Sequence, residues 1–256
     1  MRLEITSLAC GYPGHPVTEP ISLSVSAGEA LYLLGPNGSG KTTLFKTILG
    51  LLTRLGGTIA IDGEETGTWS RARLARALAY VPQAHTPPFP YTVHDVVLTA
   101  RTAHLGIFGQ PSHRDVAIAD EAIETLGLSP LAGARYTEIS GGERQLVLIA
   151  RAVAQQSRFL VLDEPTSNLD FGNQVKVLRK IRELMGLGLG LLVTTHLPDH
   201  AFLCASRVAL LSGGKLVDLG NPDNVLTETR LKETYGVNLK IAEVEPGLKV
   251  CVPLIQ

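Results

Sequence analysis

The stretch Gly35-Pro-Asn-Gly-Ser-Gly-Lys41-Thr42 follows the apolar run Ala30 to Leu34 and precedes the run Thr42 to Leu49. An apolar strand, a glycine-rich loop and a helix in this order form the context that a phosphate-binding P-loop requires. Backbone N–H groups at the start of the helix can ring a phosphate, the Lys41 ammonium reaches the β- and γ-phosphates, and the Thr42 hydroxyl ligates Mg²⁺. The sequence therefore predicts an ATP site that contains Gly35, Pro36, Asn37, Gly38, Ser39, Gly40, Lys41, Thr42 and Thr43.

A second stretch, Phe159-Leu-Val-Leu-Asp163-Glu164, is an apolar strand that ends in two carboxylates. An acidic pair at a strand end is weak evidence alone, because such pairs are often solvated turns. Beside a P-loop it gains meaning: Asp163 is expected to hold Mg²⁺ through water, and Glu164 to polarise the attacking water.

The stretch Ile139-Ser140-Gly141-Gly142-Glu143 opens a helix just before that strand, and it resembles the LSGGQ signature of the ABC ATPases. A Ser-Gly-Gly at a helix N-terminus is a second phosphate-binding nest. One chain needs only one P-loop, so the spare nest implies the nucleotide of a partner and hence a head-to-tail dimer of two copies. The sequence departs from the signature at Ile139 and Glu143, which stand where Leu and Gln are usual; both lie outside the Ser-Gly-Gly nest.

The resemblance, which covers roughly Leu3 to Gly236, also implies roles for further residues. Tyr12 matches the aromatic that stacks on adenine, and Gln83 matches the Q-loop amide that senses Mg²⁺ and the attacking water. Asp170 ends the D-loop, and His196 matches the switch histidine that hydrogen-bonds the γ-phosphate. The resemblance implies ATP and Mg²⁺ as cofactors, and an ATPase activity.

The pattern of the chain predicts an α/β fold, a P-loop NTPase core of the ABC ATPase type with an antiparallel β subdomain and an α-helical insertion. The early strands are expected at 3–8, 21–25, 30–34 and 58–61. Helices from Val93 and from about His113 to Leu126, with Thr92 and Ser112 as N-caps, place the insertion at about 84–139. An ATPase domain over 1–236 is then followed by a short tail over 237–256.

Composition excludes other classes. The 23 Lys+Arg nearly balance the 24 Asp+Glu, so there is no basic footprint for nucleic acid. The apolar runs are too short to span a bilayer and the N-terminus has no secretory pattern, so we expect a chain at the cytoplasmic face of the cell membrane. Three scattered cysteines suggest buried, reduced thiols, and four histidines between 85 and 113 lack the spacing of metal ligands.

The same resemblance implies separate transmembrane permease subunits and, indirectly, a solute-binding protein. The stretch from Phe89 to Gly106 and the run Asp170-Phe-Gly-Asn-Gln174 look like ATPases of metal-chelate importers. That group takes up ferric siderophores, haem and cobalamin, and molybdate importers have the same architecture. Two alternatives stay open: a zinc or manganese importer ATPase, and a soluble ABC ATPase of iron–sulfur cluster assembly. We expect the insertion to dock on the permease, with Asp95 and Arg101 as candidate contact residues. The cargo itself leaves no trace in this sequence.

Overall fold

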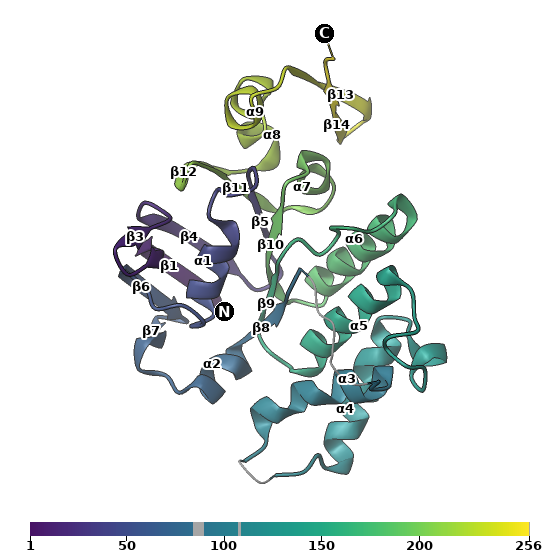
Figure 1. Cartoon of the computed structure of the whole chain (residues 1–256). Coiled ribbons are helices and arrows are strands. Elements are labelled where there is room, and N and C mark those ends of the chain that lie inside the picture. Colours follow the sequence, from purple (N-terminus) through teal and green to yellow (C-terminus); the bar gives the residue numbers. More distant parts are fainter. Residues whose placement is uncertain (84–89, 107–108, 256) are drawn as a thin grey trace. The chain divides into compact units, whose positions relative to one another are not determined.

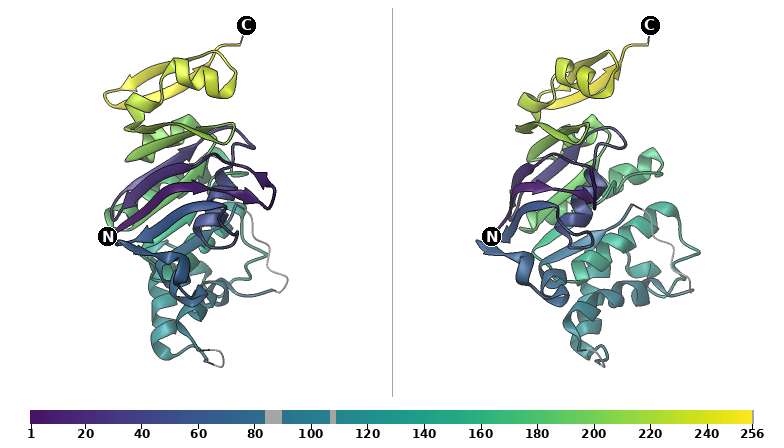
Figure 2. Two further views of the ribbon diagram at one scale, coloured as in Figure 1. Left: turned by 90° about the vertical axis from the view of Figure 1, so that its left-hand side faces the viewer. Right: turned by 60° about the vertical axis from the view of Figure 1, so that its left-hand side comes forward.

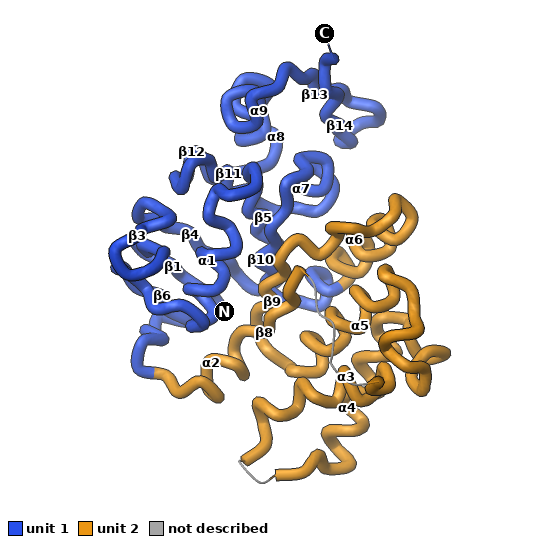
Figure 3. Tube along the Cα trace, in the orientation of Figure 1, with its two compact units in different colours: residues 1–68, 184–256 blue, residues 69–183 orange. Residues whose placement is uncertain are grey.

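The computed structural model describes residues 1–83, 90–106 and 109–255, and the chain forms two compact units (Figure 3). Unit 1 contains residues 1–68 and 184–256, and unit 2 contains residues 69–183. Unit 2 thus begins ahead of the expected insertion and ends beyond it. Within the described ranges, no helix is both long and apolar enough to cross a membrane.

Unit 1 contains an antiparallel sheet in the order β4-β1-β6-β7. Leu3, Ile5 and Leu8 of β1 are buried, and the register shifts between Ile5 and Leu8. The shift accompanies a positive φ of 47° at Ser7, which interrupts the alternation and lets Leu8 face the core. The bounds are β1 Arg2–Ala9, β4 Ile21–Ser26, β6 Gly56–Ile61 and β7 Glu64–Glu65, with a 3₁₀ turn over Thr66–Thr68.

The same unit holds a second group of strands, in which β5 (Ala30–Leu34) lies between β10 (Gly190–Thr195) and β11 (Arg207–Ser212). Both pairings are parallel, and every residue of β5 and β10 is buried. Strand β12 (Lys215–Gly220) continues β11 as the predicted hairpin around Gly213 and Gly214. The P-loop leads from β5 into α1 (Lys41–Ile48) (Figure 1).

The segment after residue 236, expected as a short tail, contains a β-hairpin of β13 (Leu239–Glu245) and β14 (Leu248–Pro253). It lies at one end of unit 1 (yellow in Figure 2) and packs on α7 and α9. The residues of its strands are half-buried or exposed, so hydrophobic alternation does not mark it in the sequence. The remaining elements of the unit are β2 Gly11–Tyr12, β3 His15–Pro16, α7 Pro198–Cys204, α8 Pro222–Val225 and α9 Glu228–Tyr235.

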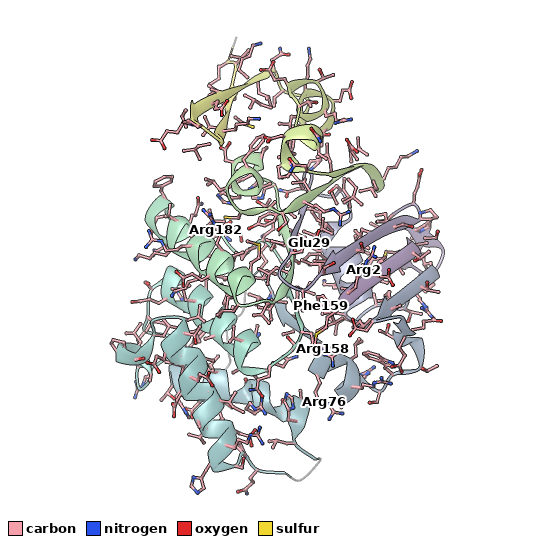
Figure 4. All side chains as sticks on the ribbon, turned by 180° about the vertical axis from the view of Figure 1, so that it is seen from behind. Arg2, Glu29, Arg76, Arg158, Phe159 and Arg182 are labelled. Atoms are coloured by element: carbon pink, nitrogen blue, oxygen red, sulfur yellow. The ribbon has the colours of Figure 1, made fainter. Side chains whose placement is uncertain are left out.

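In unit 2, β8 (Leu78–Val81) pairs in parallel with β9 (Phe159–Leu162). Helix α2 (Arg71–Ala77) runs directly into β8, and the backbone N–H of Arg158 donates to the carbonyl of Ala77 (3.2 Å). Arg76 on α2 and the pair Arg158 and Phe159 at the start of β9 can be followed in Figure 4. The apolar run 159–162 is buried at every position, as expected for a core strand.

The helical insertion is present. Both predicted N-caps form capping boxes, Thr92 with Asp95 at the start of α3 and Ser112 with Asp115 at the start of α4. Helix α5 packs on α3 and α4. The bounds are α3 Val93–Leu98, α4 His113–Thr125, α5 Gly141–Ala154 and α6 Phe171–Gly186, with 3₁₀ turns η2 Thr99–His104 and η3 Ser129–Leu131; residues 84–89 of the expected insertion lie outside the described residues.

Arg101 lies inside the insertion and not on its surface, which contradicts its expected role as a contact residue. Its side chain pairs with Asp115 (2.8 Å) and donates to the carbonyl of Ala154 (2.8 Å) and to Gln156 Oε1 (3.1 Å). A cation at the C-terminus of α5 also satisfies carbonyls that a helix end leaves open. Arg101 therefore links the insertion to α5. Its charge is visible in the sequence, but its burial is not.

Candidate nucleotide-binding site

The P-loop of unit 1 starts where buried parallel strands end. Leu34, the last residue of β5, pairs with Thr195, the last residue of β10. Gly35 and His196 therefore directly follow the ends of two neighbouring strands. The carboxyl ends of parallel strands are the usual place for a bound ligand in an α/β sheet. The structure thus brings the predicted switch histidine to the strand ends from which the predicted P-loop departs.

The loop has the shape of an anion cradle. Gly40 is the N-cap of α1 with φ 97°, no side chain caps this helix, and its first turn has no acidic residue. The Ser39 hydroxyl is buried and has no hydrogen-bond partner among the described residues. A buried hydroxyl without a partner costs free energy, and a phosphate oxygen is an acceptor for it. These features fit a phosphate group.

Lys41 lies within this cradle, and its side chain is buried. Its ammonium donates to the carbonyl oxygens of Gly35 (2.7 Å) and Pro36 (3.0 Å). The cation is therefore held by the loop itself and is ready to pair with phosphate oxygens. Thr42, at the start of α1, is exposed, as a residue that ligates a metal on the bound nucleotide has to be.

Tyr12 is the last residue of β2 and its neighbour across the small hairpin is His15. The side chain is 48% exposed. An exposed ring on unit 1 is available for stacking on a base.

The two predicted carboxylates of unit 2 lie at the end of β9, beside β8. Asp163 is 2% exposed, and its N–H donates to the carbonyl of Val81 (2.9 Å). The amide of Gln83 donates to Glu164 Oε2 (3.2 Å), so the predicted Q-loop residue contacts the predicted base. Glu164 has a positive φ of 46°, a strained conformation of a kind found at functional sites.

Tyr80 is a residue of this region that sequence reasoning did not select. Its hydroxyl lies 3.4 Å from Asp163 Oδ2, a long contact. Burial, followed by the charge of Asp163, raises the pKa of Tyr80 to about 12, so the phenol stays protonated as a donor. Its position on the strand just before Gln83 is the feature of the sequence that could have pointed to it.

The predicted signature forms the N-terminus of α5. Ser140 Oγ accepts the N–H of Glu143 (3.3 Å), and Glu143 Oε2 accepts the N–H of Ser140 (2.8 Å). The Ser140 hydroxyl and N–H hold the pKa of Glu143 below its ordinary value. The nest therefore carries its own carboxylate in the first turn.

Asn173 is a second residue that the sequence did not single out, and it links the signature to the D-loop. A Cβ on Gly142 would lie 2.4 Å from Asn173 Cγ, so the start of α6 closely approaches the start of α5. Asp170 accepts the backbone N–H of Asn173 (2.9 Å) and its side-chain amide (2.7 Å). The predicted D-loop residue thus caps α6.

Comparison with known proteins identifies the family. The ABC transporter family model matches residues 18–167. An uncharacterized ABC transporter ATP-binding protein of Haemophilus influenzae is 41% identical over 92% of this chain and 89% of its own length. The hemin import ATP-binding protein HmuV of Burkholderia lata is 37% identical, over 91% of this chain and 92% of its own.

A solved structure has the same fold. It shows an inward-facing conformation of an ABC transporter assigned to the metal-chelate type, with a TM-score of 0.87 and 31% identity over 99% of this chain and 97% of that chain. The cobalamin import ATP-binding protein BtuD of Halobacterium salinarum is 33% identical over 94% of this chain and 60% of its own length. The chain belongs to the ATP-binding subunits of ABC transporters, which are ATPases.

Proposed function

We propose that this chain binds and hydrolyses Mg²⁺-ATP to drive import of a metal chelate through separate permease subunits. The observation that carries the ATP site is the uncapped N-terminus of α1, with the buried Ser39 hydroxyl and Lys41 in one loop. The cargo class is supported by relatives named for import of hemin and of cobalamin. We place the chain at the cytoplasmic face of the membrane, because ATP is available to such a subunit there.

The residues have distinct tasks. Lys41 leaves the carbonyls of Gly35 and Pro36 to neutralise the β- and γ-phosphates, while the loop N–H groups hold their oxygens. Thr42, Asp163 and Gln83 are the residues that would hold Mg²⁺, which supplies charge neutralisation when bound. Tyr12 stacks on adenine, and His196 hydrogen-bonds the γ-phosphate.

Glu164 accepts the proton of the attacking water. It is half-buried, and its Oε2 accepts a hydrogen bond from the Gln83 amide, which orients the carboxylate. Because Gln83 precedes the insertion directly, this contact also connects the base to the part of the chain proposed to meet the permease.

The nest at Ser140, Gly141, Gly142 and Glu143 binds the γ-phosphate held by a second copy of the chain. Two copies in a head-to-tail arrangement then share two ATP molecules, with Asp170 near the same interface. ATP binding closes this dimer and hydrolysis reopens it.

The composite site is tested with Glu164→Gln, which keeps the P-loop and the nest but removes the base. Size-exclusion chromatography with ATP is expected to show a stable dimer of Glu164→Gln and only a transient one of the wild type. Adding Ser140→Arg fills the nest and is expected to keep the chain monomeric while ATP still binds. A monomeric Glu164→Gln at high concentration with ATP would contradict the dimer.

The permease is expected to contact the exposed side of the insertion. Asp95 is exposed there, although its carboxylate also caps α3 by accepting from the N–H and hydroxyl of Thr92 (3.0 and 2.6 Å). Charge reversal at Asp95 therefore needs a control for helix loss. Thr92→Ala removes the hydroxyl of the same cap but keeps the Asp95 charge, and circular dichroism compares the two variants. Uptake that survived substitutions throughout the described part of 90–106 would place the contact elsewhere.

Cargo is tested by uptake. Cells with the intact chain or with Lys41→Ala receive radiolabelled hemin, cobalamin, a ferric siderophore, molybdate or zinc, and Lys41-dependent accumulation of one of them identifies the cargo. Accumulation of zinc alone would contradict the metal-chelate proposal.

A further inference from the structure

The C-terminal hairpin of β13 and β14 has no strand neighbour among the described residues other than its own two strands. A two-stranded hairpin alone is marginally stable in water. Its order must therefore come from contacts with the rest of unit 1, and these contacts involve three short helices.

Carboxylates hold both edges of the hairpin. Ile241 and Cys251 face each other across the pair. In an antiparallel ladder, alternate facing residues direct their N–H groups outward. The N–H of Cys251 donates to Asp199 Oδ1 of α7 (2.7 Å), and that of Ile241 donates to Glu228 Oε1 of α9 (3.1 Å).

Two lysines of the hairpin add further contacts. Lys240 pairs with Glu228 (3.1 Å) and Lys249 with Asp223 of α8 (2.7 Å). Among these carboxylates, Asp199 is the one nearest in sequence to a residue of the proposed ATP site. It lies in the first turn of α7, three residues after His196.

Two local hydrogen bonds lie in the segment between the end of β10 and α7. Leu197 N–H donates to Thr195 Oγ1 (3.1 Å), and His200 N–H donates to the Leu197 carbonyl (3.3 Å). The bond from Cys251 to Asp199 is shorter than either and comes from a distant part of the sequence. Burial, then the Asp199 charge, raises the pKa of the Cys251 thiol to about 12, so the thiol stays protonated beside this carboxylate.

We propose that the hairpin braces the segment that carries His196, with Asp199 as the positioning residue and the backbone N–H of Cys251 as its anchor. This inference rests on the proposed role of His196 at the γ-phosphate. A group that acts over one hydrogen bond loses much of its effect when displaced by about 1 Å. A fixed Asp199 limits how far the backbone between 196 and 199 can move.

The test uses the facing positions of the hairpin. Cys251→Pro removes the N–H that contacts α7, and Ile241→Pro removes the equivalent N–H that contacts α9. Neither N–H belongs to the ladder, and Pro253 already occupies an equivalent outward position facing Leu239. Cys251→Ala keeps the N–H and removes only the thiol, and Asp199→Ala removes the acceptor without changing the hairpin.

Two measurements are made on each full-length variant: amide hydrogen exchange of the peptide 196–204, and steady-state ATP hydrolysis. Cys251→Pro and Asp199→Ala are expected to speed exchange about tenfold, in line with loss of one hydrogen bond to a charged group. Their kcat is expected to fall several-fold with KM for ATP unchanged. Ile241→Pro and Cys251→Ala are expected to leave both quantities near wild type.

The proposal would be overturned if the peptide 196–204 exchanged at the same rate in Asp199→Ala and in the wild type. It would also be overturned if Cys251→Pro and Ile241→Pro changed the exchange rate and kcat equally. If both prolines unfold the hairpin, Asp199→Ala decides alone. A wild-type chain that does not hydrolyse ATP would contradict the proposed function. Hydrogen exchange would still test whether the hairpin restrains the segment 196–199.

Discussion

Helices α1 and α5 both begin at a glycine-rich turn, but they begin differently. At α1 the N-cap is Gly40, no side chain caps the helix and its first turn has no acidic residue. At α5 the N-cap is Ser140, which forms a capping box with the carboxylate of Glu143. The N-terminus of α1 can accept an external anion, whereas the N-terminus of α5 already has the Glu143 carboxylate beside it.

This difference predicts unequal affinities. A phosphate at α1 meets the helix dipole and the Lys41 ammonium together. A phosphate at α5 meets the dipole beside an ionised Glu143, since the pKa of this carboxyl lies below its ordinary value. Tight binding at α1 and weak binding at α5 would suit the proposed dimer, in which each chain holds its own nucleotide and separates from its partner after each cycle.

The largest expected effect is that of Lys41→Ala. Removing the main positive charge of the loop is expected to lower kcat/KM for ATP by at least about a hundredfold, which corresponds to about 3 kcal/mol. Lys46→Ala, in the last turn of the same helix, is the matched control and should behave like wild type. Normal hydrolysis by Lys41→Ala would show that the α1 cradle is not the ATP site.

Gly142→Ala is expected to act through packing. Its Cβ would overlap Asn173 Cγ, and overpacking of this kind costs about 1–3 kcal/mol in unfolding free energy. At Gly141 the nearest atom to an added Cβ is 3.8 Å away, so Gly141→Ala should be tolerated. Chemical denaturation compares the two, and Asn173→Ala should rescue only part of the Gly142→Ala loss, because the Asn173 Cβ, which alanine keeps, would still lie 2.8 Å from the added Cβ. Equal destabilisation by the two alanines would refute this reading of the contact.

Glu143→Gln makes α5 more like α1 in charge. Gln can still cap the Ser140 N–H, so the helix should fold as before. Loss of one negative charge beside the nest is expected to tighten ATP-driven dimerisation of Glu164→Gln about fivefold, the scale of a charge at a helix terminus. Analytical ultracentrifugation measures the change, with Glu138→Gln, outside the helix, as the control. An unchanged dimer affinity would mean that Glu143 does not face the partner's phosphate.

The smallest effect is a pH dependence confined to α5. Because the folded pKa of Glu143 is below the unfolded value of 4.5, its capping contribution is complete above about pH 4.5 and is lost as pH falls through the folded value. Hydrogen exchange at the first turn of α5 should therefore accelerate below pH 4.5. The first turn of α1, which has no acidic residue, should show no such step.

Local patterns allowed much of the site to be predicted. The order of strand, glycine-rich loop and helix specified α1, and the spacing of Thr92 from Asp95 and of Ser112 from Asp115 specified the caps of α3 and α4. These motifs act within one turn of backbone, so their chemistry is visible in consecutive residues. The hairpin β13–β14 was missed because its stability comes from carboxylates of distant helices.

The sequence by itself determined which residues form each nest and which strand ends carry the carboxylates, because those features depend on neighbouring dihedrals and on apolar runs. Only the tertiary structure decided that Arg101 is buried against Asp115, that Gly142 must lack a side chain because of Asn173, and that Asp199 is tied to Cys251. Each of these pairs joins residues of different elements. Their proximity follows from how whole elements pack, and residue type and spacing do not contain it.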